Sequence, residues 1–180
     1  WPEIFVTALT TGRNALASYV VEFDGRRFQT LGSGLGWFFR VVPAPGKGEV
    51  LLGQGQKSGK SPMAEPIVEL QWKDQRYAAA KEILPAGKAS TMGVAAGDIL
   101  NNGNPKLLAY DEYDHLQILS CQGERVWRGE KYFGGSPAYY ALPRENPGES
   151  PAKFYLPVRM VLADLDGNGR PEVILPQNMD

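Results

Sequence analysis

Oxygen-bearing side chains alternate with glycine in the segment 164–172, between two apolar runs. A hard divalent cation such as calcium binds six to eight oxygens at about 2.3–2.6 Å, and a chain must curl tightly to supply them. Glycine permits that curl because it adopts positive φ angles without steric penalty. Carboxylates crowded into one turn would repel one another without a cation. The segment therefore predicts a cation site at positions 1, 3, 5 and 9, which hold Asp164, Asp166, Asn168 and Glu172.

An EF-hand loop and an acidic turn without an ion are the two alternatives for this segment. The first six positions suit an EF-hand, but position 12 requires a bidentate Glu, and Leu175 stands there. The residues after the loop, Val173–Pro176, predict a strand that ends at proline, whereas an EF-hand loop is followed by a helix. The acidic turn without an ion stays open.

Size, charge and cysteine usage limit the class of protein. The chain has 180 residues, 43% apolar and 22% charged, which is typical of one soluble globular domain. Its formal charge of −1 gives no excess that would indicate a nucleic-acid partner, and no apolar run approaches the ~20 residues of a membrane helix. Cys121 is the single cysteine, so no intrachain disulfide is expected. Since the chain begins with Trp1, either a leader has been removed or the chain is a piece of a longer one.

One strand pattern recurs four times along the chain. A short apolar strand follows a Gly or Pro turn and a polar anchor residue, and successive anchors lie 46, 57 and 66 residues apart. Between the anchors, three segments predict hairpins that turn at Asp24-Gly25, Lys73–Gln75 and Gln122-Gly123. A period of about 50 residues with four strands per unit is typical of β-propeller blades. The anchors are Glu3, Glu49, Lys106 and Glu172.

The segment 164–172 resembles the calcium loop of FG-GAP repeats, also called VCBS repeats. These repeats build the propeller of integrin alpha subunits and of many bacterial surface proteins, and their motif D-h-D-x-[DN]-G-x-x-[DE]-h matches here at every defined position. The resemblance covers the whole chain in blade rhythm, whereas only this loop matches closely. Phe133–Ala138 is also similar to the Phe-Gly and Gly-Ala-Pro elements of the family. The resemblance implies calcium as the cofactor, with the backbone carbonyl of Arg170 joining the four side chains as a ligand.

The other copies of the loop have lost most of their ligands. The segment 98–106 keeps positions 1 and 5, but Leu100 replaces the second acid and Lys106 replaces the last. We expect no calcium there, and we expect the Lys106 ammonium to pair with Asp98 in its place. In Val41–Glu49 only the last acid remains. One intact copy predicts a structural metal site, in which calcium binding is coupled to folding.

Aromatic residues between prolines make 133–159 the most unusual stretch outside the cation loop. Long aromatic loops on a rigid scaffold are typical binding surfaces. The alternative is that these aromatic side chains pack against neighbouring blades. The candidate ligand-binding residues are Tyr139, Tyr140, Phe154 and Tyr155.

Three further segments are weaker candidates. Gly53–Ser61 ends in Gly-Lys-Ser, but Gln54 stands where a phosphate-binding loop requires glycine, so a surface loop is expected. Asp111–His115 contains the only histidine and predicts an exposed turn, with a second cation site as the alternative. Tyr77–Leu84 is the best helix candidate, yet its place in the repeat predicts the second strand of a hairpin.

These patterns predict an all-β chain of four-stranded antiparallel blades that represents only part of a β-propeller. Residues 1–180 form one segment of about three and a half blades, completed by the remaining blades or by another chain. The family resemblance implies an extracytoplasmic location, in the periplasm, at the cell surface or secreted. It also implies a non-enzymatic, calcium-stabilised binding or scaffold module for a protein or carbohydrate ligand.

Two other functions stay open at this point. Some polysaccharide lyases and hydrolases use related propellers, so a polysaccharide-active enzyme is the first alternative, for which Tyr139, Tyr140 and His115 are candidate bases. A purely structural spacer is the second. Neither a nucleic-acid partner nor a membrane span is expected.

Overall fold

The computed structural model describes residues 2–44, 48–56, 60–120, 122–133, 135–144, 146 and 148–177. Within these ranges the chain forms fifteen β-strands and one short 3-10 helix, and the paired strands run antiparallel. The prediction of an all-β fold is confirmed. The described strands form several small sheets, and no closed barrel or propeller is identified among them.

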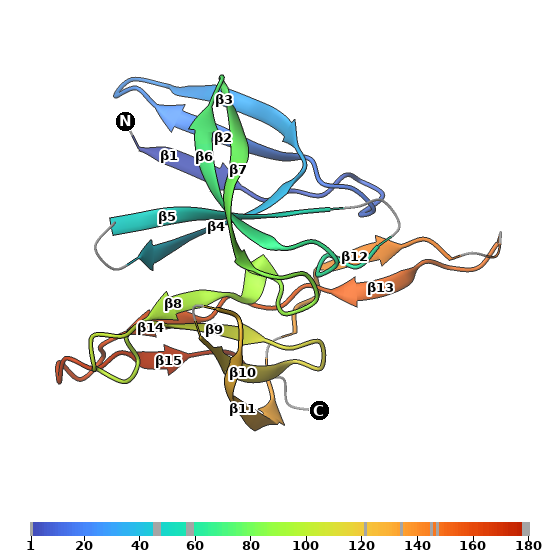
Figure 1. The fold of residues 1–180 in the computed structure, drawn as a ribbon. Helices are drawn as coiled ribbons and strands as arrows, with labels where there is room; N and C mark the ends of the chain where they lie inside the picture. The colour runs from blue at the N-terminus through green and yellow to red at the C-terminus, as the bar shows by residue number, and fades with distance from the viewer. Residues whose placement is uncertain are drawn as a thin grey trace.

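Three sheets follow one another along the chain, and in each of them every strand pairs with its neighbour in sequence (Figure 1). The first sheet has three strands, and the second and third have four each. The strands are β1 (Glu3–Val6), β2 (Ser18–Phe23) and β3 (Phe28–Leu35); β4 (Trp37–Ala44), β5 (Gly48–Gly55), β6 (Ile67–Lys73) and β7 (Arg76–Leu84); and β8 (Ala95–Gly97), β9 (Lys106–Tyr110), β10 (His115–Leu119) and β11 (Arg125–Tyr132).

Two short hairpins and a helical turn complete the described fold. The hairpin of β12 and β13 projects from the side of the stacked sheets, whereas the hairpin of β14 and β15 lies beside β8 and β9 (Figure 1). The 3-10 turn η1 precedes β8. These elements are η1 (Thr91–Gly93), β12 (Tyr139–Leu142), β13 (Ala152–Tyr155), β14 (Val161–Ala163) and β15 (Glu172–Ile174).

The predicted repeat corresponds to a recurring arrangement of strands. The four anchors lie in β1, β5, β9 and β15, at the first or second residue of each strand. The strands β5, β9 and β15 each pair with the strand before them, and these preceding strands β4, β8 and β14 contact one another in that order. The three predicted hairpins are β2–β3, β6–β7 and β10–β11, and Tyr77–Leu84 lies in β7, so its prediction as a strand is confirmed.

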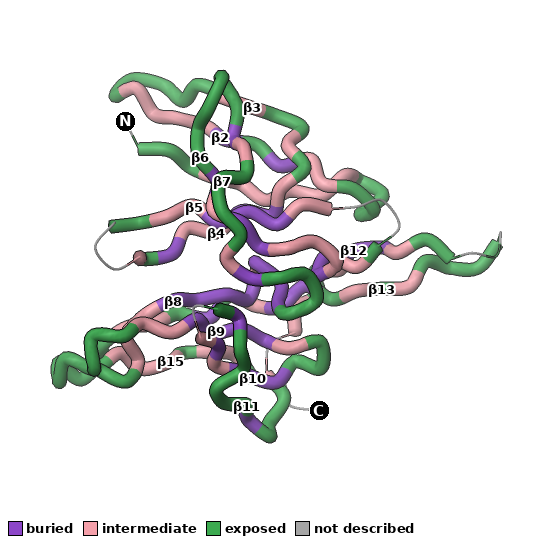
Figure 2. The backbone as a smooth tube through the Cα atoms, in the orientation of Figure 1, coloured by how far each residue is buried: buried purple, intermediate pink, exposed green. Residues whose placement is uncertain are grey.

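Successive sheets pack face to face, and the strand β9 shows how the sequence achieves this. Leu107 and Ala109 belong to the core shared with the second sheet, whereas Leu108 and Tyr110 pack against the β14–β15 hairpin. Alternate side chains of a strand point to opposite faces, so a strand that is apolar at every position is buried on both sides. Figure 2 shows this burial concentrated where the sheets meet, with exposed residues at the hairpin tips.

A buried amide holds the connection between the second and third sheets in place. Gln54 is 1% exposed, and its Nε2 donates hydrogen bonds to the carbonyl oxygens of Glu65 and Ala89. Its Oε1 accepts from the backbone N–H and the hydroxyl of Thr91. Because a buried polar group costs stability unless it is hydrogen-bonded, these bonds make Gln54 a structural residue. The surface loop expected at Gly53–Ser61 is therefore wrong for its first part, because Gly53–Gly55 belong to β5 and Gln54 is buried. Residues 57–59 lie outside the described ranges.

Gly93 is buried where the third sheet meets the strand-free segment after β13. A Cβ at this position would lie 2.6 Å from Cδ2 of Tyr110 and 3.0 Å from Cγ of Pro157, and both rings are rigid. We expect Gly93→Ala to lower the free energy of unfolding by about 1–3 kcal/mol, as overpacked cores do. Urea unfolding measures this. Gly36→Ala is the matched control because a Cβ there meets nothing within 4 Å, and equal effects of the two substitutions would contradict this account.

Candidate functional site

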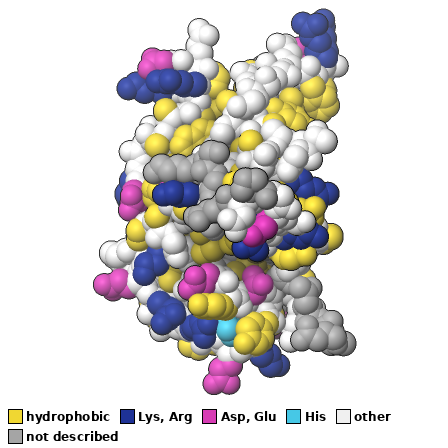
Figure 3. Space-filling view, turned by 90° about the vertical axis from the view of Figure 1, so that its right-hand side faces the viewer, with side chains coloured by type: hydrophobic (Ala, Val, Ile, Leu, Met, Phe, Trp, Pro, Cys, Tyr) yellow, Lys and Arg dark blue, Asp and Glu magenta, His cyan; other side chains and the backbone are white. Residues whose placement is uncertain are grey.

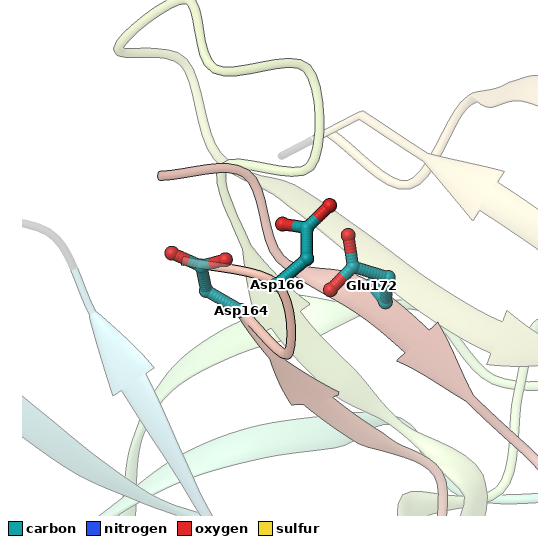
Figure 4. A group of neighbouring side chains, drawn as sticks. All are labelled: Asp164, Asp166 and Glu172. Carbon is teal, nitrogen blue, oxygen red and sulfur yellow. The ribbon is translucent and has the colours of Figure 1, made fainter. Parts of the chain in front are cut away.

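The predicted cation loop connects β14 to β15, and sheet pairing closes its two ends. Ala163 is the cross-strand partner of Glu172, so the first and last acids of the loop are brought together by the hairpin. One carboxylate oxygen from each of Asp164, Asp166 and Glu172 lies within 4.8 Å of the others. Figure 4 shows these three side chains gathered at the loop. The β-hairpin thus collects three of the predicted ligands in one place.

Backbone amides of the loop turn inward to the side chains that sequence reasoning singled out. Asp164 accepts hydrogen bonds from the N–H groups of Asn168 and Gly169, at 3.1 and 2.8 Å. Glu172 Oε2 accepts from Leu165 N–H at 2.8 Å. The tight path requires positive φ at two glycines, 75° at Gly167 and 82° at Gly169. These bonds hold the carboxylates over the loop, so the ligand positions are organised by the loop itself.

The degraded copy between β8 and β9 has the same conformation. Asp98 accepts from the N–H groups of Asn102 and Gly103, at 3.1 and 2.7 Å, as Asp164 does in the intact loop. Asn102 Oδ1 accepts from Asn104 N–H at 3.0 Å, and the equivalent bond from Arg170 N–H to Asn168 is 2.8 Å. Positive φ angles recur at the same two positions, with 48° at Asn101 and 73° at Gly103. The two segments are therefore one structural unit, and the loop between β4 and β5 includes residues 45–47, outside the described ranges.

The expected pairing of Lys106 with Asp98 is wrong. Among the described residues, no ion pair joins these two side chains. Both oxygens of the Asp98 carboxylate accept backbone N–H groups of their own loop, which satisfies them locally. This copy thus folds through hydrogen bonds to the side chains at positions 1 and 5, without an acid at position 3 or 9.

The residues of the intact loop fit a hard cation. Three carboxylates and the Asn168 amide offer oxygen donors, which is the ligand chemistry of calcium and magnesium. The loop ends in the strand β15, so the prediction of a strand is confirmed and an EF-hand, which needs a helix there, is excluded. Asp164 and Asp166 are exposed and Glu172 is partly exposed, so an ion has open access from solvent.

The four candidate aromatic residues lie together, on opposite faces of one hairpin. Tyr139 pairs with Tyr155, and Tyr140 pairs with Phe154, across β12 and β13. Tyr140 is fully buried and packs with Phe38 and Leu156, and Phe154 packs against the same cluster. Burial raises the pKa of the Tyr140 hydroxyl, which donates a hydrogen bond to the carbonyl of Asn14. Tyr140 and Phe154 therefore attach the hairpin to the body of the protein.

The other face of the hairpin carries the aromatic pair of Tyr139 and Tyr155, with Arg13 and Lys153 near the ring of Tyr139, and this group is here called the Tyr139 surface. The rings of Tyr139 and Tyr155 are 6.0 Å apart at an interplanar angle of 66°. Arg13 Cζ lies 4.5 Å and Lys153 Nζ 4.9 Å from the Tyr139 ring centroid, within the range of a cation–π interaction. Tyr155 is 53% exposed, and an open cavity of about 700 Å³ borders Arg13 and Tyr139. This arrangement suits a ligand that combines a flat apolar face with negative charge.

The acidic stretch at Asp111–His115 forms the turn between β9 and β10, with Glu112, Tyr113 and Asp114 exposed as predicted. Sequence reasoning missed its partner Arg128, which lies on β11. Arg128 Nε donates to Asp111 Oδ2 at 2.6 Å, and its Nη2 lies 2.6 Å from His115 Nδ1. A guanidinium can only donate, so Nδ1 accepts and the proton of the neutral imidazole is assigned to Nε2. Figure 3 shows basic and acidic side chains around the single histidine.

Burial by itself would raise the pKa of Asp111, but hydrogen bonds from Arg128 and from the N–H groups of His115 and Tyr113 outweigh it and lower the pKa. Partial desolvation by neighbouring atoms and the nearby Asp111 charge raise the pKa of Asp114, although its side chain reaches solvent. The carboxylate of Asp111 is thus fixed as an anion and engaged on both oxygens. The turn holds an ion pair in place of the second cation site that was the alternative.

The candidate bases of an enzyme do not share a site. His115 contacts Asp111, Arg128 and the ring of Tyr132. Tyr139 lies on the β12–β13 hairpin and contacts Tyr155, Arg13 and Lys153. Tyr140 is buried. Cys121 lies outside the described residues.

Comparison with protein-family models, curated proteins and solved structures finds no match to this chain. The likeness of the loop to FG-GAP repeats therefore rests on its own residues. Among the described residues, no helix has the length and hydropathy needed to cross a membrane.

Arg128→Gln tests the Asp111 ion pair. We expect a loss of about 1–2 kcal/mol in the free energy of unfolding at neutral pH, the lower end of the range for a hydrogen bond to a charged group, because Arg128 is partly exposed to solvent. The folded pKa of Asp111 lies below its ordinary value of 3.8. Its contribution is therefore present above that value and is lost as the pH falls through the lower folded pKa. Urea unfolding from neutral to acid pH should show wild type and variant converging at low pH.

Arg125→Gln is the matched control for this variant, because Arg125 is exposed on the same strand. We expect it to change stability by less than about 0.5 kcal/mol, as surface substitutions do. A gap between wild type and Arg128→Gln that is the same at every pH would contradict the role given to Asp111.

Proposed function

We propose that this chain is a calcium-stabilised β-propeller segment of FG-GAP/VCBS type that acts as an extracytoplasmic binding or scaffold module. The observation that carries the proposal is the intact loop beside its degraded copy. Asp166 and Glu172 occupy positions where the degraded loop has Leu100 and Lys106, yet both loops share the two backbone hydrogen bonds to the first aspartate and positive φ at the same two positions. In the intact loop the two acids also accept the backbone N–H groups of Leu165 and Asn168. Because the degraded loop follows the same path without them, cation binding is the role that we assign to these acids.

The arrangement of strands supports the propeller part of the proposal. The two four-stranded sheets, β4–β7 and β8–β11, each have an inner strand, a loop, an anchor strand and a hairpin, in the order of a four-stranded blade. The inner strands β4, β8 and β14 are neighbours, and consecutive sheets pack face to face, as blades do around an axis. The remaining blades or another chain complete the ring in this proposal.

Calcium acts here as a structural ion. A cation that binds the folded loop and not the unfolded chain stabilises the protein by RT ln(1 + [Ca²⁺]/Kd). Extracellular calcium modules have Kd values of roughly 10⁻⁴–10⁻³ M, and the exposed loop with Asn168 in place of a third Asp suits that range. Calcium at this level outside the cytoplasm agrees with the proposed location.

The Tyr139 surface is the proposed ligand-binding face. Tyr155 presents an exposed ring, and Arg13 and Lys153 add positive charge beside Tyr139. Sugar rings stack on aromatic faces through their C–H groups, and carboxylates pair with Lys and Arg. Among the protein and carbohydrate ligands that the sequence left open, these contacts favour an acidic carbohydrate. Binding is preferred to catalysis because the candidate bases lie in separate networks.

Asp164→Ala should abolish the stabilisation of this protein by calcium. At tenfold excess over Kd, calcium should add about 1.4 kcal/mol, which raises Tm by roughly 3–6 °C for a chain of this size. Thermal melts in millimolar calcium and in excess chelator measure the shift. Asp98→Ala is the matched control, since Asp98 makes the same backbone hydrogen bonds in the degraded loop. It should lower Tm but keep the calcium shift. Identical melts of the wild type with calcium and with chelator would refute the metal site.

Tyr155→Ala should weaken binding of acidic polysaccharide by about tenfold. A nucleobase stacked on an aromatic side chain contributes roughly 1–3 kcal/mol, and we expect a sugar ring stacked on Tyr155 to contribute at the lower end of that range. Affinity electrophoresis with polygalacturonate as the probe and neutral dextran as its uncharged counterpart measures this. Tyr113→Ala is the matched control because Tyr113 is also exposed, at 64%, but lies on the β9–β10 turn. If wild type binds neither polymer, or if both variants bind alike, the Tyr139 surface is not the ligand-binding face.

A further inference from the structure

One arginine links the inner strands of three sheets. Arg40 lies on β4, and its Nε donates to the carbonyl of Val94 at 2.9 Å, directly before β8. Its Nη2 donates to the carbonyl of Met160 at 3.1 Å, directly before β14. Both acceptors are neutral, so this cation is held at the junction of the inner strands without a counter-charge from its partners.

Arg159 adds a second positive charge at this junction. Burial lowers the pKa of Arg40 to about 10, and the charge of Arg159 acts in the same direction. In the part of the chain that the structure describes, no carboxylate forms an ion pair with either arginine. A guanidinium has more N–H donors than the two bonds of Arg40 use, and Arg159 donates no hydrogen bond to a described residue. The junction therefore has an excess of positive charge and of hydrogen-bond donors.

Two adjoining cavities open onto these donors. A cavity of about 500 Å³ runs along β1, with Ile4, Phe5 and Val6 in its wall. A second cavity of about 380 Å³ runs along the inner strands, past Ala96 and Leu162. Arg40, Val41 and Arg159 line both of them. Each cavity also has one carboxylate in its lining, Glu3 in the first and Glu49 in the second, and both residues are exposed.

We propose that Arg40 and Arg159 bind the carboxylate group of a small organic acid at the junction of these two cavities. Guanidinium groups bind carboxylates through paired N–H···O hydrogen bonds, and such charge-assisted bonds are the strong ones. Apolar residues of β1 and β4 line the space beside the arginines, so the body of an organic acid fits there better than a bare inorganic ion. The two arginines belong neither to the calcium loop nor to the aromatic and basic side chains of the Tyr139 surface, although the cavity along β1 shares Thr7 and Met92 with the cavity beside Tyr139.

Arg159→Gln tests this site with little effect on the fold, because Arg159 makes no hydrogen bond or ion pair to a described residue. We expect glucuronate and succinate, each added at millimolar concentration, to shift the Arg40 Nε–H signal in ¹⁵N NMR spectra of the wild type. The variant should weaken that binding by about tenfold, the loss expected for one charge-assisted hydrogen bond. Arg159→Lys keeps the charge but not the paired donors, so it should bind with intermediate affinity.

The probes and a control separate the remaining readings. Stronger binding of glucuronate than of succinate identifies an acidic sugar as the source of the carboxylate, and the reverse order identifies an aliphatic acid. Arg76→Gln, on the exposed end of β7, should bind like the wild type. Sulfate that binds as tightly as both acids would show a general anion site and overturn the assignment to a carboxylate. The site would be overturned if none of the probes shifted the Arg40 Nε–H signal, or if wild type and Arg159→Gln bound the acids equally well.

Discussion

The packing of each sheet against the next is the constraint on which this structure depends. A single four-stranded sheet with two apolar faces cannot bury both of them by itself, so a sheet on either side must cover them. The strand β9 makes this requirement explicit, because Leu107 and Ala109 face the second sheet while Leu108 and Tyr110 face the β14–β15 hairpin. Each fully buried Leu of this kind contributes roughly 1.5–3 kcal/mol. Stacking of consecutive units is thus the source of the core.

Stacking also decides where the polar residues with special roles are found. It brings β4, β8 and β14 together at the inner edge. There Arg40 donates hydrogen bonds to the carbonyl oxygens of Val94, directly before β8, and Met160, directly before β14. It leaves the β12–β13 hairpin outside the stack, attached through Tyr140 and Phe154 and exposed at Tyr155 (Figure 1). The candidate functions therefore divide by position. Structural ion binding is proposed for the loop between β14 and β15, and ligand contacts are proposed at the inner junction and on the projecting hairpin.

Local patterns made much of this fold predictable from sequence. The alternation and turn residues around Asp24-Gly25 and Gln122-Gly123 predict hairpins because the signal lies within a few residues. The tight turn at 164–172 is predictable for the same reason. Contacts between distant residues are not predictable in this way, since Arg128 meets Asp111 only after β10 and β11 pair. Likewise, Tyr140 is buried and Tyr155 is exposed because one face of the β12–β13 hairpin packs against Phe38, and the local sequence does not specify which face does so.

The two related loops separate what folding requires from what a cation requires. In both, an aspartate at position 1 accepts two backbone N–H groups, and positive φ angles occur at positions 4 and 6. Leu100 and Lys106 show that this conformation needs no acid at positions 3 and 9. Asp166 and Glu172 each accept one backbone N–H group of the loop, but they also add like charges within 4.8 Å of Asp164. Like charges at this separation oppose folding unless a cation compensates them, so these two acids are the residues that make the loop a calcium site in our proposal.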